Sequence, residues 1–300
     1  MRLLWIQPGA IGDFIVSLPG IAWVRQKFKP EWFEVWAERV NVPLVQASVY
    51  ANRAVALADT GIDRYPQGEP LFKRLQEFDR VLSWSEAGAA AVSQRHANSC
   101  FMQALPAGTS FHVLDFKKAQ LQNLFGSALT GFPPHPRIHW TAEDIQFAKA
   151  FLPNNQSHPI AVIHPGASGK RKCWSAANFA AMAVRLAEQK GMGILMAEGP
   201  LDASACDEVS HLMAASLVKA EPQRLRLNNL RQLSAVLGRC ALYVGNDSGI
   251  THLAAASGTS TLAIFTATNP KVWAPRGPVV RVCVNPTVDE AWARLSGPID

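Results

Sequence analysis

The chain carries little charge. Asp, Glu, Lys and Arg make up 17% of its 300 residues, against about 25% in an average soluble domain. Hydrophobic residues make up 48%. This excludes an intrinsically disordered tail protein, which combines much charge with few apolar side chains. The length is sufficient for about two domains, each with a hydrophobic core of its own.

Long apolar runs and paired cysteines are also missing. Runs such as residues 3–6 and 253–256 are far shorter than the ~20 residues that cross a bilayer, so we expect no membrane-spanning helix. The N-terminus has the pattern of a buried strand and lacks the apolar segment and cleavage site of a signal peptide. The five cysteines are scattered and form no CxxC pair. They favour a reduced, cytoplasmic protein without structural zinc.

The positive charge is modest: 29 Lys and Arg stand against 23 Asp and Glu, which gives a net charge of +6. Such an excess can attract an anionic substrate or an anionic membrane face. No dense stripe of Lys and Arg with interleaved aromatic residues occurs, so we do not expect nucleic acid as a partner.

Both halves of the chain alternate short apolar strands with longer amphipathic segments. This pattern predicts an α/β fold with parallel sheets. A stretch rich in Gly and Pro and a later polar linker suggest a domain boundary, so we predict domains over residues 1–155 and 156–285 and a last helix within 286–300. The expected strands are 3–7, 32–37, 80–84, 159–163, 193–197, 241–244, 261–265 and 279–284. The expected helices are 14–28, 141–151, 176–189, 202–214, 228–237, one from about 248, and 287–295; the Gly/Pro-rich stretch is 123–136 and the linker 153–157.

Ligands of open α/β sheets bind beyond the carboxyl ends of the strands, and three loops in such positions stand out. In the first, Gly9 and Gly12 allow a tight turn, and Asp13 opens the next helix. Asp13 is either an ordinary helix cap or a carboxylate at the mouth of a cleft, where it can act as a general base. The G-x-G-x-x-G spacing of a dinucleotide site is absent.

The second loop, residues 164–174, leaves a strand and carries three consecutive cations at 170–172. Backbone N–H groups around Gly166, together with Ser168 and Lys172, are suited to a phosphate, although the Walker A spacing is not met. A solvated basic turn explains the same segment equally well.

The third loop ends a strand at residue 244 and begins a helix near Ser248. The first N–H groups of that helix, including those of Ser248 and Gly249, would offer a site for a diphosphate. His252 lies one turn further on and can point back to such a ligand. The structural alternatives are a plain helix cap for Asp247 and a satisfied surface or core histidine for His252.

Taken together, these loops resemble glycosyltransferase family 9, the ADP-heptose:lipopolysaccharide heptosyltransferases. The Asp-Ser-Gly-x-x-His element is the most specific part of the resemblance, and residues 111–115 and 266–275 are similar to weaker family patterns. The matching residues are Gly12-Asp13, His164-Pro165-Gly166 with Lys172-Cys173-Trp174, and Asn246-Asp247-Ser248-Gly249 with His252-Leu253-Ala254-Ala255.

The resemblance implies a GT-B architecture, in which two Rossmann-like domains face a central cleft. The first domain would hold the acceptor and the second the nucleotide sugar, and the last helix would cross back to the first domain. Asp13 would be the base that deprotonates the acceptor hydroxyl, and Lys172 would stabilise the leaving diphosphate. Gly166, Ser168, Asp247, Ser248, Gly249 and His252 would form the donor site, and Gly9 and Gly12 the acceptor-side loop.

The activity implied is the inverting transfer of a heptose from ADP-heptose, as a substrate, to a lipopolysaccharide core or another envelope glycan. Neither a metal nor a cofactor is expected, because a helix N-terminus and Lys172 supply positive charge to the developing diphosphate. The expected partners are the nucleotide-sugar donor and an anionic glycolipid or oligosaccharide acceptor. The expected location is the cytoplasm, with peripheral contact at the inner membrane.

Two departures from the family pattern bear on the substrates. Arg231 stands where many members carry an acidic residue that contacts the ribose, and Thr266-Ala267-Thr268 replaces Gly-Pro-Thr. The first domain also lacks an obvious basic cluster for a heavily phosphorylated acceptor. A GT-B transferase with a different donor, a nucleotide-sugar-binding protein without transfer activity, a GT-B epimerase and a Rossmann-type oxidoreductase are the alternative functions.

Overall fold

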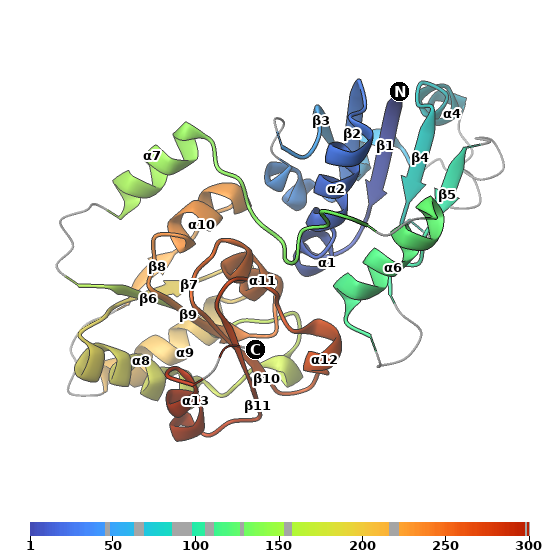
Figure 1. Ribbon diagram of the computed structural model, residues 1–300. Coiled ribbons are helices and arrows are strands. Elements are labelled where there is room, and N and C mark those ends of the chain that lie inside the picture. The colour runs from blue at the N-terminus through green and yellow to red at the C-terminus, as the bar shows by residue number, and fades with distance from the viewer. Residues whose placement is uncertain are drawn as a thin grey trace. The chain divides into compact units, whose positions relative to one another are not determined.

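The computed structural model describes residues 1–45, 49–62, 69–85, 98–105, 111–126, 129–152, 158–215, 222–297 and 299 (Figure 1). The chain forms two compact units, Met1–His139 and Trp140–Asp300. Each unit is a parallel sheet with helices packed on it, so the predicted α/β class with two Rossmann-like domains is confirmed. No helix of the described part of the chain is long and apolar enough to cross a membrane.

The first unit contains a five-stranded sheet whose order is β3-β2-β1-β4-β5 (Figure 1). The order reverses between β1 and β4, so the loop after β1 opens at the switch point, where ligands of such sheets bind. The strands are β1 (Arg2–Gln7), β2 (Trp32–Ala37), β3 (Arg53–Ala56), β4 (Arg80–Ser83) and β5 (Ser99–Phe101). The helices are α1 (Ile11–Ile15), α2 (Leu18–Phe28), α3 (Leu57–Thr60), α4 (Glu69–Leu75) and α6 (Val113–Phe125), with the 3-10 helix η1 (Arg39–Leu44).

Large aromatic side chains fill both faces of the first sheet. Trp36 and Phe78 pack edge to face on one side, within a cluster that includes Leu4 and residues of α3 and α4. Trp5 and Trp84, both fully buried, stack with their ring centroids 4.0 Å apart. Because both faces are covered, the strands are apolar on both sides, which explains the high hydrophobic content of the chain.

One helix expected from the sequence is in fact two. The segment predicted as a single helix over residues 14–28 is interrupted between α1 and α2, and Pro19 lies in the first turn of α2. Proline is tolerated there because the N–H groups of a first turn have no partner within the helix. The interruption makes α1 a short, separate turn that carries Asp13.

The second unit contains a six-stranded parallel sheet of order β11-β10-β9-β6-β7-β8, which reverses between β6 and β9. Its strands are β6 (Ile160–His164), β7 (Gly193–Ala197), β8 (Gln223–Leu225), β9 (Leu242–Asn246), β10 (Thr261–Phe265) and β11 (Val280–Val284). Its helices are α7 (Ala142–Phe151), α8 (Ala176–Lys190), α9 (Ala203–Ala214), α10 (Leu230–Leu237), α11 (Gly249–Ala256), α12 (Pro270–Trp273) and α13 (Val288–Arg294), with the 3-10 helix η2 (Lys170–Lys172).

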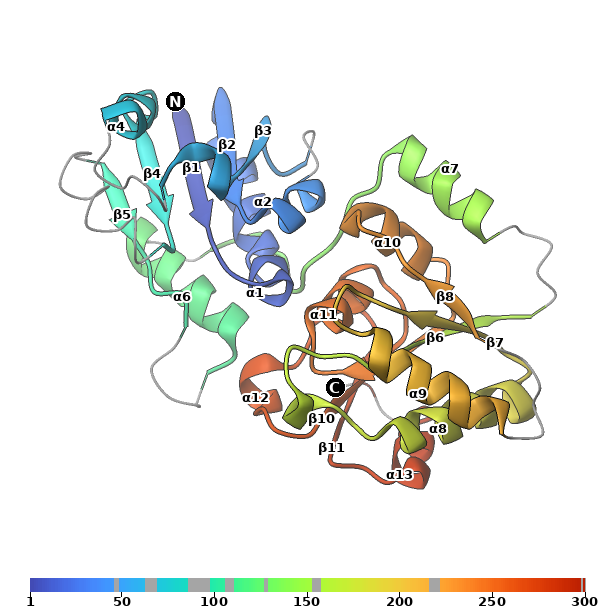
Figure 2. The same ribbon diagram turned by 180° about the vertical axis from the view of Figure 1, so that it is seen from behind.

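The main core of the second unit lies between the sheet and helices α8, α9 and α13 (Figure 2). Phe179 of α8, Val209 of α9 and Ala291 of α13 are fully buried there against the strands. The last helix, which the family resemblance assigned to a return onto the first domain, therefore packs within the second unit.

The structure divides the chain between His139 and Trp140, earlier than the expected boundary at 155/156. The reason is that α7 packs on α10 of the second unit, where the Trp140 Nε1–H donates to Ser234 Oγ at 2.8 Å. The polar linker expected at 153–157 lies outside the described residues.

Candidate active site

Asn246, at the end of β9, joins the two loops that open at the switch point of the second sheet. Its side-chain Oδ1 accepts from the backbone N–H of Trp174 at 2.8 Å, and its Nδ2 donates to the carbonyl of Pro165 at 2.8 Å. The Trp174 indole N–H in turn donates to the carbonyl of Pro286 at 2.8 Å. One fully buried amide thus fixes both ends of the loop that follows β6.

His164 and Asp202 connect this loop to the start of α9. His164 is buried, with Nε2 3.1 Å from Asp202 Oδ2 and Nδ1 3.3 Å from Ser248 Oγ. The hydrogen bond from His164 is the main reason that the pKa of Asp202 lies below its ordinary value. Gly166 packs directly on Asp202, because a Cβ at that position would lie 2.0 Å from Asp202 Oδ1. A glycine is therefore required at position 166.

Lys172 is held in place by a buried carboxylate. Asp247 Oδ2 accepts from Lys172 Nζ at 3.0 Å and from Thr268 Oγ1 at 2.6 Å. The Asp247 side chain is 7% exposed and that of Lys172 is 32% exposed, so the anion is inside the protein and the ammonium reaches the surface. An oriented cation at a surface is suited to bind a phosphate without losing much side-chain entropy on binding.

The N-terminus of α11 lies beside this pair in sequence. Ser248 is its N-cap, and the Ser248 side chain accepts from the N–H of Thr251. Thr251 Oγ1 donates to the carbonyl of Asn246 and lies 3.1 Å from the Tyr243 hydroxyl, so the helix start is tied to the end of β9. His252 is buried, with 4% of its surface exposed. Its predicted contact with a ligand stays a prediction.

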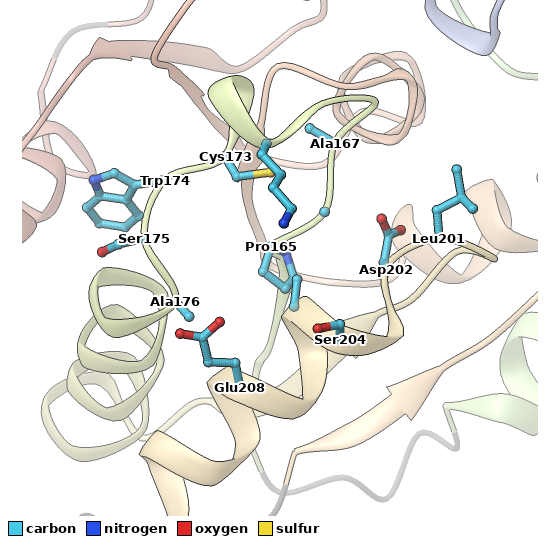
Figure 3. Close-up of a pocket in the computed structure, with 13 residues that line it drawn as sticks. Pro165, Ala167, Cys173, Trp174, Ser175, Ala176, Leu201, Asp202, Ser204 and Glu208 are labelled. Carbon is cyan, nitrogen blue, oxygen red and sulfur yellow. The ribbon is translucent and has the colours of Figure 1, made fainter.

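Two hollows flank the loop after β6. The larger, of about 470 Å³, lies between this loop and the start of α9 (Figure 3). Asp202, Ser204 and Glu208 extend from the α9 side in Figure 3, with Cys173 and Ala167 on the loop. The smaller, of about 380 Å³, is lined by Ser168, Gly169, Lys170, Arg171, Lys172, Ala267 and Thr268. Three consecutive cations around one hollow favour an anionic ligand.

Asp13 occupies the switch point of the first unit. It lies in the first turn of α1, and its Oδ2 accepts from the N–H of Ala10 at 3.1 Å, so it does cap the helix. Gly9 has φ +112°, a backbone conformation that residues with a side chain rarely adopt. A Cβ at this position would also lie 3.1 Å from Asp13 Cβ. The Asn41 amide donates to the Gly9 carbonyl at 3.2 Å. The turn at Gly9 thus fixes where the carboxylate lies, while Gly12 forms part of α1.

Sequence reasoning missed Lys117, a buried cation near Asp13. Lys117 is 4% exposed, and its Nζ lies 3.4 Å from Gln7 Oε1. Burial lowers the pKa of Lys117 to about 8, and the Asp13 carboxylate opposes this change. The available signal was position: Lys117 lies between Leu114 and Leu121, on the apolar face of α6.

Arg231 has a structural partner. Its Nε donates to Asp144 Oδ2 of α7 at 2.6 Å. Burial opposes ionisation of Asp144, but hydrogen bonds from Thr141 and Arg231 bring its pKa below the ordinary value. This ion pair links α10 to α7 and explains why an arginine is compatible with this position.

The fold is that of two Rossmann-like domains with loops at the strand ends, and comparison with known proteins specifies the family. The sequence profile of glycosyltransferase family 9 (heptosyltransferase) matches residues 110–293. The chain belongs to this family and is a glycosyltransferase, as the sequence predicted.

A curated relative and two solved structures illustrate the similarity. Lipopolysaccharide heptosyltransferase 3 of Escherichia coli K12 is 30% identical, with 88% of this chain and 82% of the relative covered. A family 9 glycosyltransferase structure from Veillonella parvula has a TM-score of 0.82 at 16% identity, covering 98% of this chain and 95% of the other. The E. coli heptosyltransferase WaaC with ADP-2-deoxy-2-fluoro heptose has a TM-score of 0.67 at 18% identity, covering 98% and 97%.

The structure brings together Gly166, Asp247, Ser248 and Lys172 within one unit, and it places Asp13, Gly9 and Gly12 in the other. Among the described residues, no group of three or more His, Cys, Asp or Glu side chains is placed to hold a metal ion. The metal-free site remains a prediction.

Substitution of Asn246 tests whether its amide organises the loops after β6 and β9. We expect Asn246→Ala to lower the free energy of unfolding by about 2–4 kcal/mol, because buried partners at Pro165 and Trp174 lose their hydrogen bonds. Denaturant unfolding measures this. Asn123→Ala is the control, since it removes the same amide from an exposed position of α6. An unchanged stability of Asn246→Ala would contradict the role assigned to Asn246.

The depressed pKa of Lys117 predicts a pH dependence of stability. Below pH 8 the folded and unfolded states both carry the charge, and its burial penalty applies in full. Between pH 8 and 10.5 the folded state releases a proton that the unfolded state retains, so stability rises with pH, by about 1 kcal/mol from pH 8 to 9.

The measurement is denaturant unfolding at pH 8 and 9 of the wild type, Lys117→Met and the neighbouring control Lys118→Met. Lys117→Met should lose the rise, and Lys118→Met should keep it. Burial raises the pKa values of Cys206 and Cys240 to about 12, so these thiols lower the free energy of unfolding as the pH rises. Their contribution is the same in all three proteins and does not affect the comparison. An identical pH dependence in Lys117→Met and the wild type would contradict the assignment.

Proposed function

We propose that the protein transfers a heptose from ADP-heptose to a hydroxyl group of a lipopolysaccharide core or related envelope glycan, with inversion at the anomeric carbon. The basic hollow around Lys172, with Lys172 oriented by Asp247, carries this proposal, because a diphosphate leaving group needs preorganised positive charge. Membership of family 9 and the similarity to WaaC, whose structure was solved with ADP-2-deoxy-2-fluoro heptose, support the choice of donor.

The proposed reaction is a single displacement. Asp13 accepts the proton of the acceptor hydroxyl while the hydroxyl oxygen forms a bond to the anomeric carbon of the heptose. The bond between that carbon and the diphosphate oxygen breaks, and ADP leaves with the electron pair. Attack from the face opposite the leaving group inverts the configuration.

Stabilisation of the leaving group is assigned to the second unit. Lys172 and the N–H groups at the start of α11, capped by Ser248, provide positive charge. This charge stabilises the diphosphate more strongly as its bond to the sugar breaks and its negative charge grows. Ser168 and Gly166 belong to the loop beside the cations, and Asp247 orients Lys172. In this proposal the cations take the part that a metal ion plays in other glycosyltransferases, so neither metal nor cofactor is required.

The proposed acceptor is an anionic glycolipid or oligosaccharide, met by the protein at the cytoplasmic face of the inner membrane. The relative from E. coli K12 is named for lipopolysaccharide. The net charge of +6 favours approach to such an anionic surface.

The donor class is tested by thermal shift. We expect ADP to raise the melting temperature more than UDP, GDP or CDP at equal concentration, since a ligand at 100 times its Kd stabilises the folded state by about 2.7 kcal/mol. Lys172→Met should weaken the ADP shift, and Lys149→Met, which removes an exposed lysine from α7, should leave it unchanged. A larger rise in melting temperature with another nucleotide would show that the donor carries that nucleotide and is not ADP-heptose.

Transfer itself is tested by mass detection of the product with purified lipopolysaccharide acceptors and ADP-heptose. We expect Asp13→Asn to lower kcat by roughly 100-fold or more while ADP binding persists, because only the proton acceptor is lost. Asp79→Asn is the matched control: Asp79 accepts from the N–H of Arg2, at the opposite end of β1. Unchanged turnover in Asp13→Asn would show that Asp13 is not the base. Donor binding without product on any acceptor would favour a nucleotide-sugar-binding protein.

A further inference from the structure

The buried ammonium of Lys117 is a feature of the first unit that the proposed reaction has not used. Moving an ammonium group out of water is costly unless another group compensates its charge. Lys117 is 4% exposed in the middle of α6. A function is therefore expected for the charge, or for the groups around it.

Polar contacts connect Lys117 to the turn that carries Asp13. Lys117 Nζ donates to Gln7 Oε1 at 3.4 Å, and the Ser17 hydroxyl lies 2.9 Å from the same oxygen. Ser17 Oγ is also 3.0 Å from the backbone carbonyl of Asp13, and its single proton serves these two acceptors in turn. Gln7 ends β1 and Ser17 follows α1, so the Gln7 amide links the buried cation to both ends of the Asp13 turn.

An aromatic ring provides further stabilisation on another side of the cation. Lys117 Nζ lies 5.4 Å from the centroid of the Trp84 ring, within the range of a cation–π interaction. Trp84 is fixed by its stacking on Trp5. The ammonium thus lies between the Gln7 amide oxygen and the Trp84 ring.

Asp13 is the charged group, among the described residues, whose field raises the pKa of Lys117 against the effect of burial. The interaction is reciprocal: if the carboxylate favours the charged lysine, the charged lysine favours the carboxylate. The other titratable groups on α6 are His112 and Asp115 at its start and Lys118 beside Lys117. Arg25 and Lys27 belong to α2, which packs on α6, and Glu38 and Arg39 to η1, which packs on α1.

We propose that Lys117 is a positioning residue for the base: its buried ammonium interacts with the Asp13 carboxylate and, through Gln7 and Ser17, holds the turn that orients it. This inference rests on the proposed function, in which Asp13 takes the proton of the acceptor hydroxyl. The proton goes to Asp13, and Lys117 exchanges none. Lys117 acts on the reaction only through Asp13, because the buried lysine is not accessible to the acceptor.

The kinetic test compares Lys117→Met with Lys118→Met, which removes the same charge one residue further along α6, where Lys118 contacts Phe132. Lys117→Met should lower kcat roughly 10-fold to 100-fold with the KM for the donor unchanged. The acid limb of its kcat profile should move up by about half a pH unit or more. Lys117→Arg should restore the wild-type limb at least in part. Equal behaviour of Lys117→Met and Lys118→Met would overturn the proposal.

A double-mutant cycle separates action through Asp13 from general damage. In the Asp13→Asn background, Lys117→Met should cause no further loss of the residual rate, because the carboxylate on which Lys117 acts is gone. Additive losses would show that Lys117 acts elsewhere and would overturn the proposal.

A third measurement needs no transfer activity, so it also applies if Lys117→Met does not fold or if the proposed function fails. NMR titration of labelled lysine side chains follows the Lys117 ammonium in the wild type and in Asp13→Asn. Loss of the carboxylate should move the Lys117 titration to lower pH. An unchanged titration would refute the coupling, whereas a shift without any transfer activity would leave the coupling in place and refute the proposed function alone.

Discussion

The hydrogen bonds of Asn246 are the constraint on which the loops at the switch point of the second sheet depend. Parallel strands bring the loops after β6 and β9 to one edge of the sheet, but the sheet alone leaves each loop free to choose its path. Asn246 removes this freedom by binding the loop after β6 at both of its ends. Because Asp247 directly follows Asn246, the same residue also determines where the partner of Lys172 is placed.

Sequence patterns predict the parts of this molecule that depend on local chemistry. Buried apolar runs located the long central strands, and glycines and caps located the three loops at strand ends. The short edge strands β3, β5 and β8 escaped prediction because three or four residues carry too little periodicity. The interruption before α2 was missed because Pro19 fits the first turn of a helix as readily as it ends one.

The remaining errors concern tertiary contacts. The domain boundary was misjudged because residues 153–157 have the composition of a linker, whereas α7 is held to the second unit by Trp140 and by the Asp144–Arg231 ion pair. Neither contact has a signal in one sequence, since the partners are far apart in the chain. The same holds for His164 with Asp202 and for Lys117 with Asp13. Each residue looks ordinary in its own segment, and only the fold brings the pairs together.

Each unit contains, at its strand ends, a pair of opposite charges in which one group is buried and the other partly exposed, and the signs are exchanged between the two pairs. On the second unit a buried carboxylate, Asp247, orients the partly exposed cation Lys172. On the first, a buried cation, Lys117, accompanies the half-buried carboxylate Asp13. In each pair the inner charge is fixed by hydrogen bonds or an aromatic ring, and the outer one is partly exposed. A chain with little charge can therefore present both an anion and a cation at partly exposed positions, because each is stabilised from inside the protein and does not depend on a surface network that salt would screen.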